Sequence, residues 1–320
     1  MKFETAVIIV LIFAVGLGLY FIYPLYFGEP QEFSVSNENI SGDGEDSNSE
    51  SISDSEYPEG MLFYDNIRYS SSEISYSIDS RCDDGKSMDA REAFNIIQDR
   101  TILRFNEMAE GRGEIFINCP PEGEKPSEGI DSRHYIAGEG GPSSVINTSE
   151  YYLIKNGSII LYTDNRCDRP IIAIHELLHA LGFKHSSNKK SIMYAVSNCN
   201  QEITGDIIDK INVLYKDPSL ADLKFIYGEG SKSGRYVNFN IEILNSGLRD
   251  SGDFILTLYI NEKKTGTYDI GNLESGSGKI LKVENLFFVG NPEKLEFRVD
   301  EDNMVNEINE ENNKLSMVIG

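Results

Sequence analysis

Apolar residues follow three different patterns along this chain, and each pattern predicts a different kind of structure. Residues 6–27 contain no charged side chain and are almost wholly apolar. Residues 28–58 contain almost no large apolar side chain, so they cannot bury enough surface to offset the entropy of ordering. From residue 59 onward, apolar residues recur at strand and helix periods, which predicts folded domains.

Residues 6–27 predict a transmembrane segment. Twenty-two residues in a helix extend about 33 Å, which is enough to cross the hydrocarbon core of a bilayer. Lys2 precedes the segment and acidic residues follow it, so the positive-inside rule places residues 1–5 in the cytoplasm and the rest of the chain outside. Residues 28–58 then form an acidic, disordered stalk. Cleavage of a signal peptide, which would release a secreted protein, remains the alternative.

Residues 59–218 are expected to form one domain that contains both helices and strands. Residues 74–78 alternate with period two and predict a strand, and residues 114–118 predict a second one. Between them, residues 87–108 carry apolar side chains at helical spacing, with Ser87 as the N-cap. Strand, helix and strand in about 45 residues form a βαβ unit, so the two strands are expected to be parallel neighbours.

The second half of this domain is expected to combine a hairpin with two helices. Asn156-Gly157 separates two apolar runs and predicts a tight turn between them. Residues 120–142 are rich in proline, glycine and glutamate, which predicts a long loop. The other elements expected here are a short strand at 143–148, the hairpin strands at 151–155 and 158–163, and helices at 169–181 and 204–215 with Thr204 as N-cap.

Residues 219–320 have the pattern of an all-β domain. Seven short β runs within about 100 residues, separated by turns that contain Asn and Gly, predict an immunoglobulin-like sandwich. This part contains no catalytic constellation, so we expect it to act as a spacer or a docking module. The runs are 225–227, 236–244, 254–260, 265–270, 279–283, 295–299 and 315–319.

The net charge of −23 argues against nucleic acid or an anionic membrane surface as a partner. The charge is distributed unevenly. No basic residue lies between Lys2 and Arg68, and ten carboxylates lie between Glu29 and Glu59. Much of the acidity therefore belongs to the predicted stalk and says little about a functional site.

The strongest chemical signal is the sequence H-E-x-x-H-x-x-G-x-x-H, which starts at His175. His175 and His179 are one helical turn apart on the same face, so their imidazoles can bind one ion. Gly182 can adopt a left-handed conformation that ends the helix and returns His185 as a third ligand. Three histidine ligands leave a fourth position open, which is typical of catalytic zinc. Glu176 can then act on a water in that position.

This motif resembles the signature of metzincin zinc peptidases, and Met193 in Ser-Ile-Met-Tyr resembles their Met-turn. Residues 60–217 resemble a matrixin in particular. Gly138-Glu-Gly-Gly141 is similar to that family's glycine-rich loop before its edge strand, and residues 203–215 are similar to its C-terminal helix. The resemblance implies a twisted, mostly parallel five-stranded sheet with three helices and a cleft with zinc at its floor. Residues 299–313 resemble the ending of a CARDB domain, a module related to cell adhesion.

The resemblance also implies a cofactor and a mode of substrate binding. One catalytic zinc ion is expected on His175, His179 and His185. A second, structural zinc is not expected, because only His134 lies in the relevant loop, and structural calcium is not indicated. No cysteine precedes Cys82, so we expect no cysteine that caps the zinc in a pro-segment.

Extended polypeptide substrate is expected to add a strand along residues 143–148, which include Ser144, Val145 and Ile146. Residues 195–201 would line the pocket just beyond the scissile bond. Tyr194 would act as a wall or packing residue.

The four cysteines lie outside the membrane on this topology, where disulfides persist. Three pairings are conceivable. Cys82 and Cys119 each follow a strand of the βαβ unit, so they are expected to be close together. Cys167 precedes the helix of the motif and Cys199 follows the Met-turn, and a bond between them would clamp both ends of the metal site.

These features predict a membrane-anchored zinc endopeptidase with Glu176 as general base. The alternative is an adhesion or surface-assembly protein whose metal site only stabilises its fold. A degenerate peptidase would most easily lose Glu176, and its presence favours the enzyme.

Overall fold

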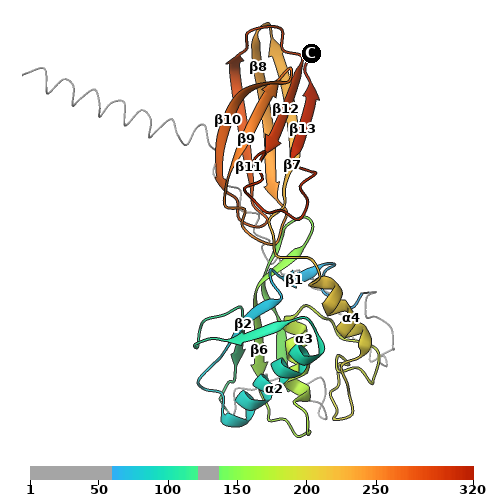
Figure 1. Cartoon of the computed structure of the whole chain (residues 1–320). Helices are drawn as coiled ribbons and strands as arrows, with labels where there is room; N and C mark the ends of the chain where they lie inside the picture. Colours follow the sequence, from blue (N-terminus) through green and yellow to red (C-terminus); the bar gives the residue numbers. More distant parts are fainter. Residues whose placement is uncertain (1–59, 122–136) are drawn as a thin grey trace, which may run out of the picture. The chain divides into compact units, whose positions relative to one another are not determined.

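A computed structural model describes residues 60–121 and 137–320, which divide between Ser219 and Leu220 into two compact units (Figure 1). The predicted cytoplasmic tail, transmembrane segment and stalk lie outside the described residues, as does His134. Within the two described ranges, no helix is long and apolar enough to cross a membrane. Each unit is described below by itself.

The first unit contains a six-stranded sheet, one strand more than the resemblance implies. Strand β6 pairs with three others: β5 pairs antiparallel along nearly its whole length on one edge, and β1 and β4 pair parallel with its two halves on the other. Strand β2 lies between β4 and β3 and pairs parallel with both. The strands are β1 Ile67–Tyr69, β2 Glu73–Ile78, β3 Arg104–Glu107, β4 Ile115–Asn118, β5 Gly138–Asn147 and β6 Tyr152–Leu161.

Three helices accompany this sheet in the described residues, namely α2 Asp84–Arg100, α3 Ile171–Ala180 and α4 Gly205–Leu214. The expected βαβ unit is present, since β2 and β4 are parallel neighbours. The expected helix at 87–108 was wrong at both ends. Its N-cap is Asp83, whose carboxylate accepts a hydrogen bond from the Lys86 N–H at 2.9 Å. The helix ends before Thr101, and the residues that follow form β3 at the edge of the sheet.

The expected hairpin at Asn156-Gly157 was also wrong, because these residues lie inside the continuous strand β6. A Cβ atom at Gly157 would lie 2.3 Å from the Tyr69 hydroxyl and 3.4 Å from the Ala180 Cβ. Glycine is therefore required here by the close approach of β1 and α3 and not by a turn. Gly138 to Gly141 likewise form the first part of β5 and not a loop before it.

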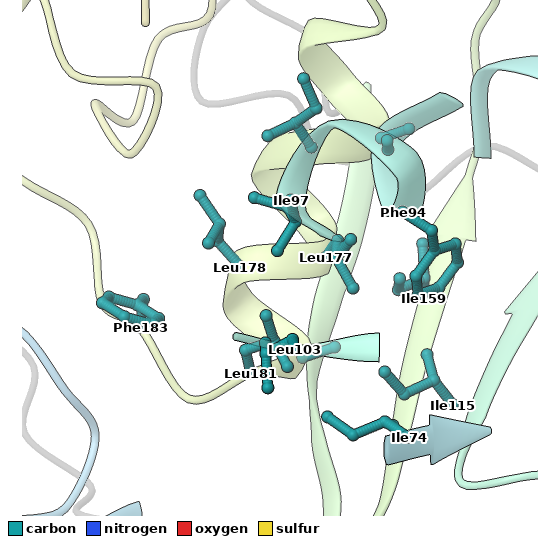
Figure 2. Close-up of a cluster of buried hydrophobic side chains, with 14 of the residues drawn as sticks. Ile74, Phe94, Ile97, Leu103, Ile115, Ile159, Leu177, Leu178, Leu181 and Phe183 are labelled. Atoms are coloured by element: carbon teal, nitrogen blue, oxygen red, sulfur yellow. The ribbon is translucent and has the colours of Figure 1, made fainter. Parts of the chain in front are cut away.

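The core of the first unit lies between the sheet and helices α2 and α3 (Figure 2). Phe94 and Ile97 of α2 belong to the same buried cluster as Leu177 of α3 and Ile115 and Ile159 of the sheet. Nine of the ten residues of α3 are buried. A helix that is buried on nearly all sides must be apolar almost throughout, so its two histidines and one glutamate are costly there and call for a chemical explanation.

The second unit contains the seven strands expected from the sequence, each within a residue or two of its expected position or longer. They form a four-stranded antiparallel sheet in the order β10-β9-β12-β13 and a three-stranded sheet in the order β11-β8-β7. Side chains from both sheets share one core, in which the rings of Phe239 and Phe297 lie 4.9 Å apart. The strands are β7 Leu223–Ser233, β8 Tyr236–Asn245, β9 Asp253–Ile260, β10 Lys263–Asn272, β11 Gly278–Phe287, β12 Lys294–Val299 and β13 Lys314–Val318.

The stability of the second unit should depend on pH through Glu296. Burial alone would raise the pKa of this carboxyl, but Arg298 at 2.6 Å and Lys314 at 3.0 Å lower it to about 2 from 4.5. A lowered pKa in the folded state stabilises the fold above pH 4.5, and this contribution is lost as the pH falls toward 2. Since the basic partners are partly exposed, we expect Glu296→Gln to cost about 1 kcal/mol at pH 7 and almost nothing at pH 2.

Urea unfolding at a series of pH values measures this difference. Glu284→Gln is the matched control, because Glu284 pairs with Lys282 at 2.9 Å on the exposed surface. A Glu296→Gln penalty that stays constant from pH 7 to pH 2 would contradict the assignment.

Candidate metal centre

Helix α3 and the turn that follows it bring three histidines together. His175 and His179 lie one turn apart, with ring centroids 4.6 Å apart. The helix ends at Gly182, which has a φ of +98° and whose N–H donates to the His179 carbonyl at 2.9 Å. A Cβ at this position would also lie 2.7 Å from an Ile67 methyl group. Glycine is therefore required at this position both by the positive φ and by the close approach of Ile67. The turn brings the His185 ring next to the other two rings.

The three Nε2 atoms face one another. The Nε2 atom of His179 lies 3.0 Å from that of His175 and 3.1 Å from that of His185, and the third separation is 3.3 Å. This is the only group of three metal-ligating side chains, drawn from His, Cys, Asp and Glu, that the described residues bring within ligating distance.

The tautomers of two of these histidines follow from their other nitrogen. His175 Nδ1 lies 2.6 Å from the Ile192 carbonyl, and His179 Nδ1 lies 2.7 Å from the Phe183 carbonyl. A carbonyl can only accept, so each Nδ1 carries the proton and donates it. Burial lowers the pKa of His175 to about 4 and that of His179 to about 3, so both rings are neutral. Their Nε2 atoms then present lone pairs to each other at 3.0 Å.

Two facing lone pairs repel unless a cation lies between them. Neutral imidazoles whose Nδ1–H groups are fixed by carbonyls are the usual ligands of Zn²⁺, and the second hydrogen bond orients the ring toward the metal. Burial also lowers the pKa of His185, which favours its neutral form. The donor set, the protonation states and the convergence of the three rings therefore fit a single zinc ion.

Glu176 lies beside these histidines without joining them. Its side chain is 6% exposed, and burial, followed by the charge of Glu139, raises its pKa to about 8. The side chain lies against the start of β5, where a Cβ added at Gly138 would lie 2.9 Å from the Glu176 Oε1 atom. A carboxyl group is thus held at the edge of the metal centre.

Two glycines allow β5 to run against α3. A Cβ at Gly140 would lie 2.2 Å from the Glu176 backbone oxygen, and one at Gly138 would lie 2.8 Å from the Glu176 side chain. Neither glycine has a positive φ, so distance and not backbone conformation requires them. Helix α3 therefore approaches the edge of the sheet through its backbone at Gly140 and through the Glu176 side chain at Gly138.

Residues 61–63, which precede β1, pair with the turn that follows α3. The Phe63 N–H donates to the Gly182 carbonyl and the Lys184 N–H donates to the Met61 carbonyl, both at 2.9 Å. The Phe63 ring stacks on His179 with centroids 6.2 Å apart. The turn that carries His185 is thus part of a short antiparallel pairing.

A cavity of about 920 Å³ opens in front of the three histidines. Glu176 and the three imidazoles form part of its lining, together with residues 137–140, residues 164–167 and residues 195–199. The cavity brings the proposed zinc ligands, an acid or base and the start of the edge strand into one space.

Comparison with known families agrees with this geometry. Residues 68–216 match the family model for Matrixin, and residues 222–317 match the model for CARDB. The chain carries a matrixin domain followed by a CARDB domain. A matrixin domain supports metallopeptidase activity and implies zinc, in agreement with the three converging histidines. No match to a curated protein was found.

Solved structures similar to the CARDB domain include the following two. One is the CARDB domain of a Pyrococcus furiosus protein in complex with di-metal ions, which is 20% identical, with 32% of this chain and 88% of that chain covered and a TM-score of 0.28. The other is a domain of a protein described as a cell surface protein from Methanosarcina acetivorans, which is 25% identical, with 32% and 91% covered and a TM-score of 0.28. These TM-scores add nothing to the assignment, which rests on the family models.

Met193 is a buried residue of the matrixin domain. Its side chain is 1% exposed, and its carbonyl accepts a hydrogen bond from the Ser186 N–H at 2.7 Å. Ser186 directly follows His185, so the turn around Met193 is tied to the segment of the third histidine. The Ile192 carbonyl, which fixes the tautomer of His175, belongs to the same turn.

The residues expected to bind substrate are not all near the cavity. Ser144, Val145 and Ile146 lie in the second half of β5 and Tyr194 follows Met193, and none of the four lines the cavity of the matrixin domain. The cavity is lined instead by Gly138, Glu139 and Gly140 from the first half of β5. Glycines at alternate positions of a strand are a signal of close approach, and that signal could have pointed to this segment.

Two disulfide bonds join Cys82 with Cys119 and Cys167 with Cys199, which are the pairs that the sequence predicts. Cys167 and Cys199 both line the cavity. This bond therefore connects the segment before α3 to the loop after Met193.

Gly140→Ala should disrupt the matrixin domain, because the new Cβ would overlap the Glu176 backbone. We expect a loss of about 1–3 kcal/mol in the free energy of unfolding, which is typical of overpacking, and a loss of bound zinc. Gly141→Ala is the matched control, because a Cβ at Gly141 has no atom within 4 Å. Thermal unfolding and zinc analysis of both variants test this contact, and equal behaviour of the two would contradict it.

Proposed function

We propose that this chain is a zinc-dependent endopeptidase anchored in the membrane, with its catalytic domain outside the cell. The observation that carries the proposal is the convergence of three histidine Nε2 atoms in a cavity that also contains the Glu176 carboxyl group. The matrixin family match supports the peptidase activity independently. His175, His179 and His185 are the proposed zinc ligands.

Zinc bound to these histidines would polarise a peptide carbonyl and make a neighbouring water a stronger nucleophile. Glu176 acts as the general base, and its Oε1 atom accepts the proton of the attacking water. The same carboxyl group then donates the proton to the nitrogen of the leaving amine, so no proton is lost or gained in the cycle. Without a metal ion, burial and the charge of Glu139 raise the pKa of Glu176 to about 8, and a bound zinc ion would lower this pKa because a positive charge favours the carboxylate that acts as base.

Substrate is proposed to bind as an extended strand along the first half of β5. On the described part of the chain, β5 pairs only with β6, so its other edge offers backbone groups to a peptide. Residues 137–140 line the cavity, so a peptide along this edge would lie beside the proposed zinc ligands. This revises the segment expected from the sequence by about six residues toward the N-terminus.

Residues 6–27 are the proposed anchor, and residues 28–58 the spacer between the membrane and the catalytic domain at 59–218. The length of the uncharged run and the position of Lys2 support this topology. Release after cleavage of the segment is the alternative, and both place the cysteine pairs in an oxidising environment.

The domain at 219–320 is proposed to bind a surface partner or to hold the enzyme in position. The CARDB family match supports an interaction module. An adhesion protein whose metal only stabilises the fold is the second candidate function, and the two differ in whether peptide bonds are cleaved.

Glu176→Gln should abolish turnover and leave zinc binding intact, because glutamine has nearly the same shape but cannot accept the proton. We expect a loss of about 10²–10⁴-fold in the rate of peptide hydrolysis. The measurement is cleavage of an unstructured protein by the wild type and the variant, with zinc content determined for both. Equal turnover would exclude Glu176 as the base.

Removal of zinc should abolish cleavage and destabilise the matrixin domain, because the histidine lone pairs would then repel each other. We expect about one zinc per chain before treatment with a chelator, a lower midpoint of thermal unfolding after it, and recovery of both properties when zinc is restored. Stoichiometric zinc with a stabilising effect but no cleavage of any polypeptide would favour the adhesion candidate.

A further inference from the structure

Residues 195–200 form an irregular loop that borders the cavity. Ala195 to Cys199 line the cavity, and residues 196–200 are exposed to solvent. An exposed loop without helix or strand lacks the hydrogen-bond ladders that hold other segments in place. Its position must therefore be fixed by contacts from outside the loop.

Gln201 supplies three such contacts. Its Oε1 atom accepts a hydrogen bond from the Asn198 N–H at 3.0 Å, and its Nε2 atom donates one to the Val196 carbonyl at 3.0 Å. Its own N–H donates to the Asn198 carbonyl at 3.3 Å. The side chain is fully buried, with an exposure of 0%.

An amide side chain is suited to this position because it donates and accepts at the same time. A carboxylate would face the Val196 carbonyl with no proton to donate, and an apolar side chain would make neither of the two side-chain hydrogen bonds to the Val196 and Asn198 backbone. A buried glutamine is unusual in a core, so its cost must be offset by these bonds.

Gln201 is in turn attached to the start of the metal-binding helix. The Arg169 guanidinium donates to the Gln201 carbonyl at 2.7 Å, and the Cys167–Cys199 disulfide joins the same two segments. The loop is thus braced against residues 167–169, which directly precede α3. Gln201 itself does not line the cavity, so it acts only through the loop.

We propose that Gln201 is a positioning residue that fixes the wall formed by residues 195–199 and thereby sets which substrate side chains the cavity accepts. This inference rests on the proposed peptidase function. Ile171 and Ile172 of α3 line the same cavity as this wall and supply apolar side chains to it. A fixed wall selects apolar substrate side chains by size, whereas a loose wall adapts to many sizes.

The test uses Gln201→Met in the full-length, zinc-loaded protein, because methionine has a similar volume and makes neither hydrogen bond. The control is Asn200→Ala, which alters the neighbouring exposed side chain and keeps the backbone bonds. Peptides that differ only in the residue after the cut (Ala, Leu, Phe or Trp) are compared by kcat and KM. Hydrogen exchange of the Asn198 amide is measured in parallel and requires no activity.

In Gln201→Met, we expect the ratio of kcat/KM between the best and the worst peptide to fall at least 5-fold, mainly through KM, with zinc content unchanged. The Asn198 amide should exchange at least 10-fold faster, and Asn200→Ala should match the wild type in both assays. An unchanged ratio, or a parallel loss for all peptides together with zinc, would overturn the proposal. If the wild type cleaves no peptide, the peptidase function fails, and unchanged exchange at Asn198 would then overturn the positioning role separately.

Discussion

Three imidazole rings that meet through unprotonated nitrogens impose the main constraint on the first domain. Their lone pairs repel, so the arrangement is stable only if a cation occupies the centre and if other groups hold the protons on the far side of the rings. The carbonyls of Ile192 and Phe183 meet the second condition for two of them. The turn after α3 and the turn around Met193 must therefore be in place before the site can exist, which explains why these irregular segments are buried.

Features that depend on neighbours in the sequence were predictable. The spacing of His175 and His179, the stop at Gly182 and the return of His185 are local geometry, and the structure brings the three rings together. The seven strands of the second domain follow from alternation of apolar residues over short runs. The parallel pairing of β2 and β4 follows from the βαβ pattern.

Features that depend on contacts between distant segments were not predictable from the sequence. Gly157 has the sequence context of a hairpin, but its role is set by Tyr69 and Ala180. The first half of β5 has the composition of a loop, but its glycines are required by the close approach of α3, which follows about thirty residues later. Phe105 fits a helical pattern, but its backbone pairs with β2 because Thr101 ends the helix. In each case a long-range approach outweighed the local preference.

The pairing of residues 61–63 with the turn before His185 bears on where the matrixin domain begins. The family match starts at residue 68, yet the backbone bonds made by Met61 and Phe63 support the segment between the second and third histidines. A recombinant fragment trimmed to the family boundary would lose the backbone hydrogen bonds that hold the turn after α3. The same pairing joins that turn directly to the chain that leads back toward the N-terminus, so a mechanical pull on that chain would reach His185 first.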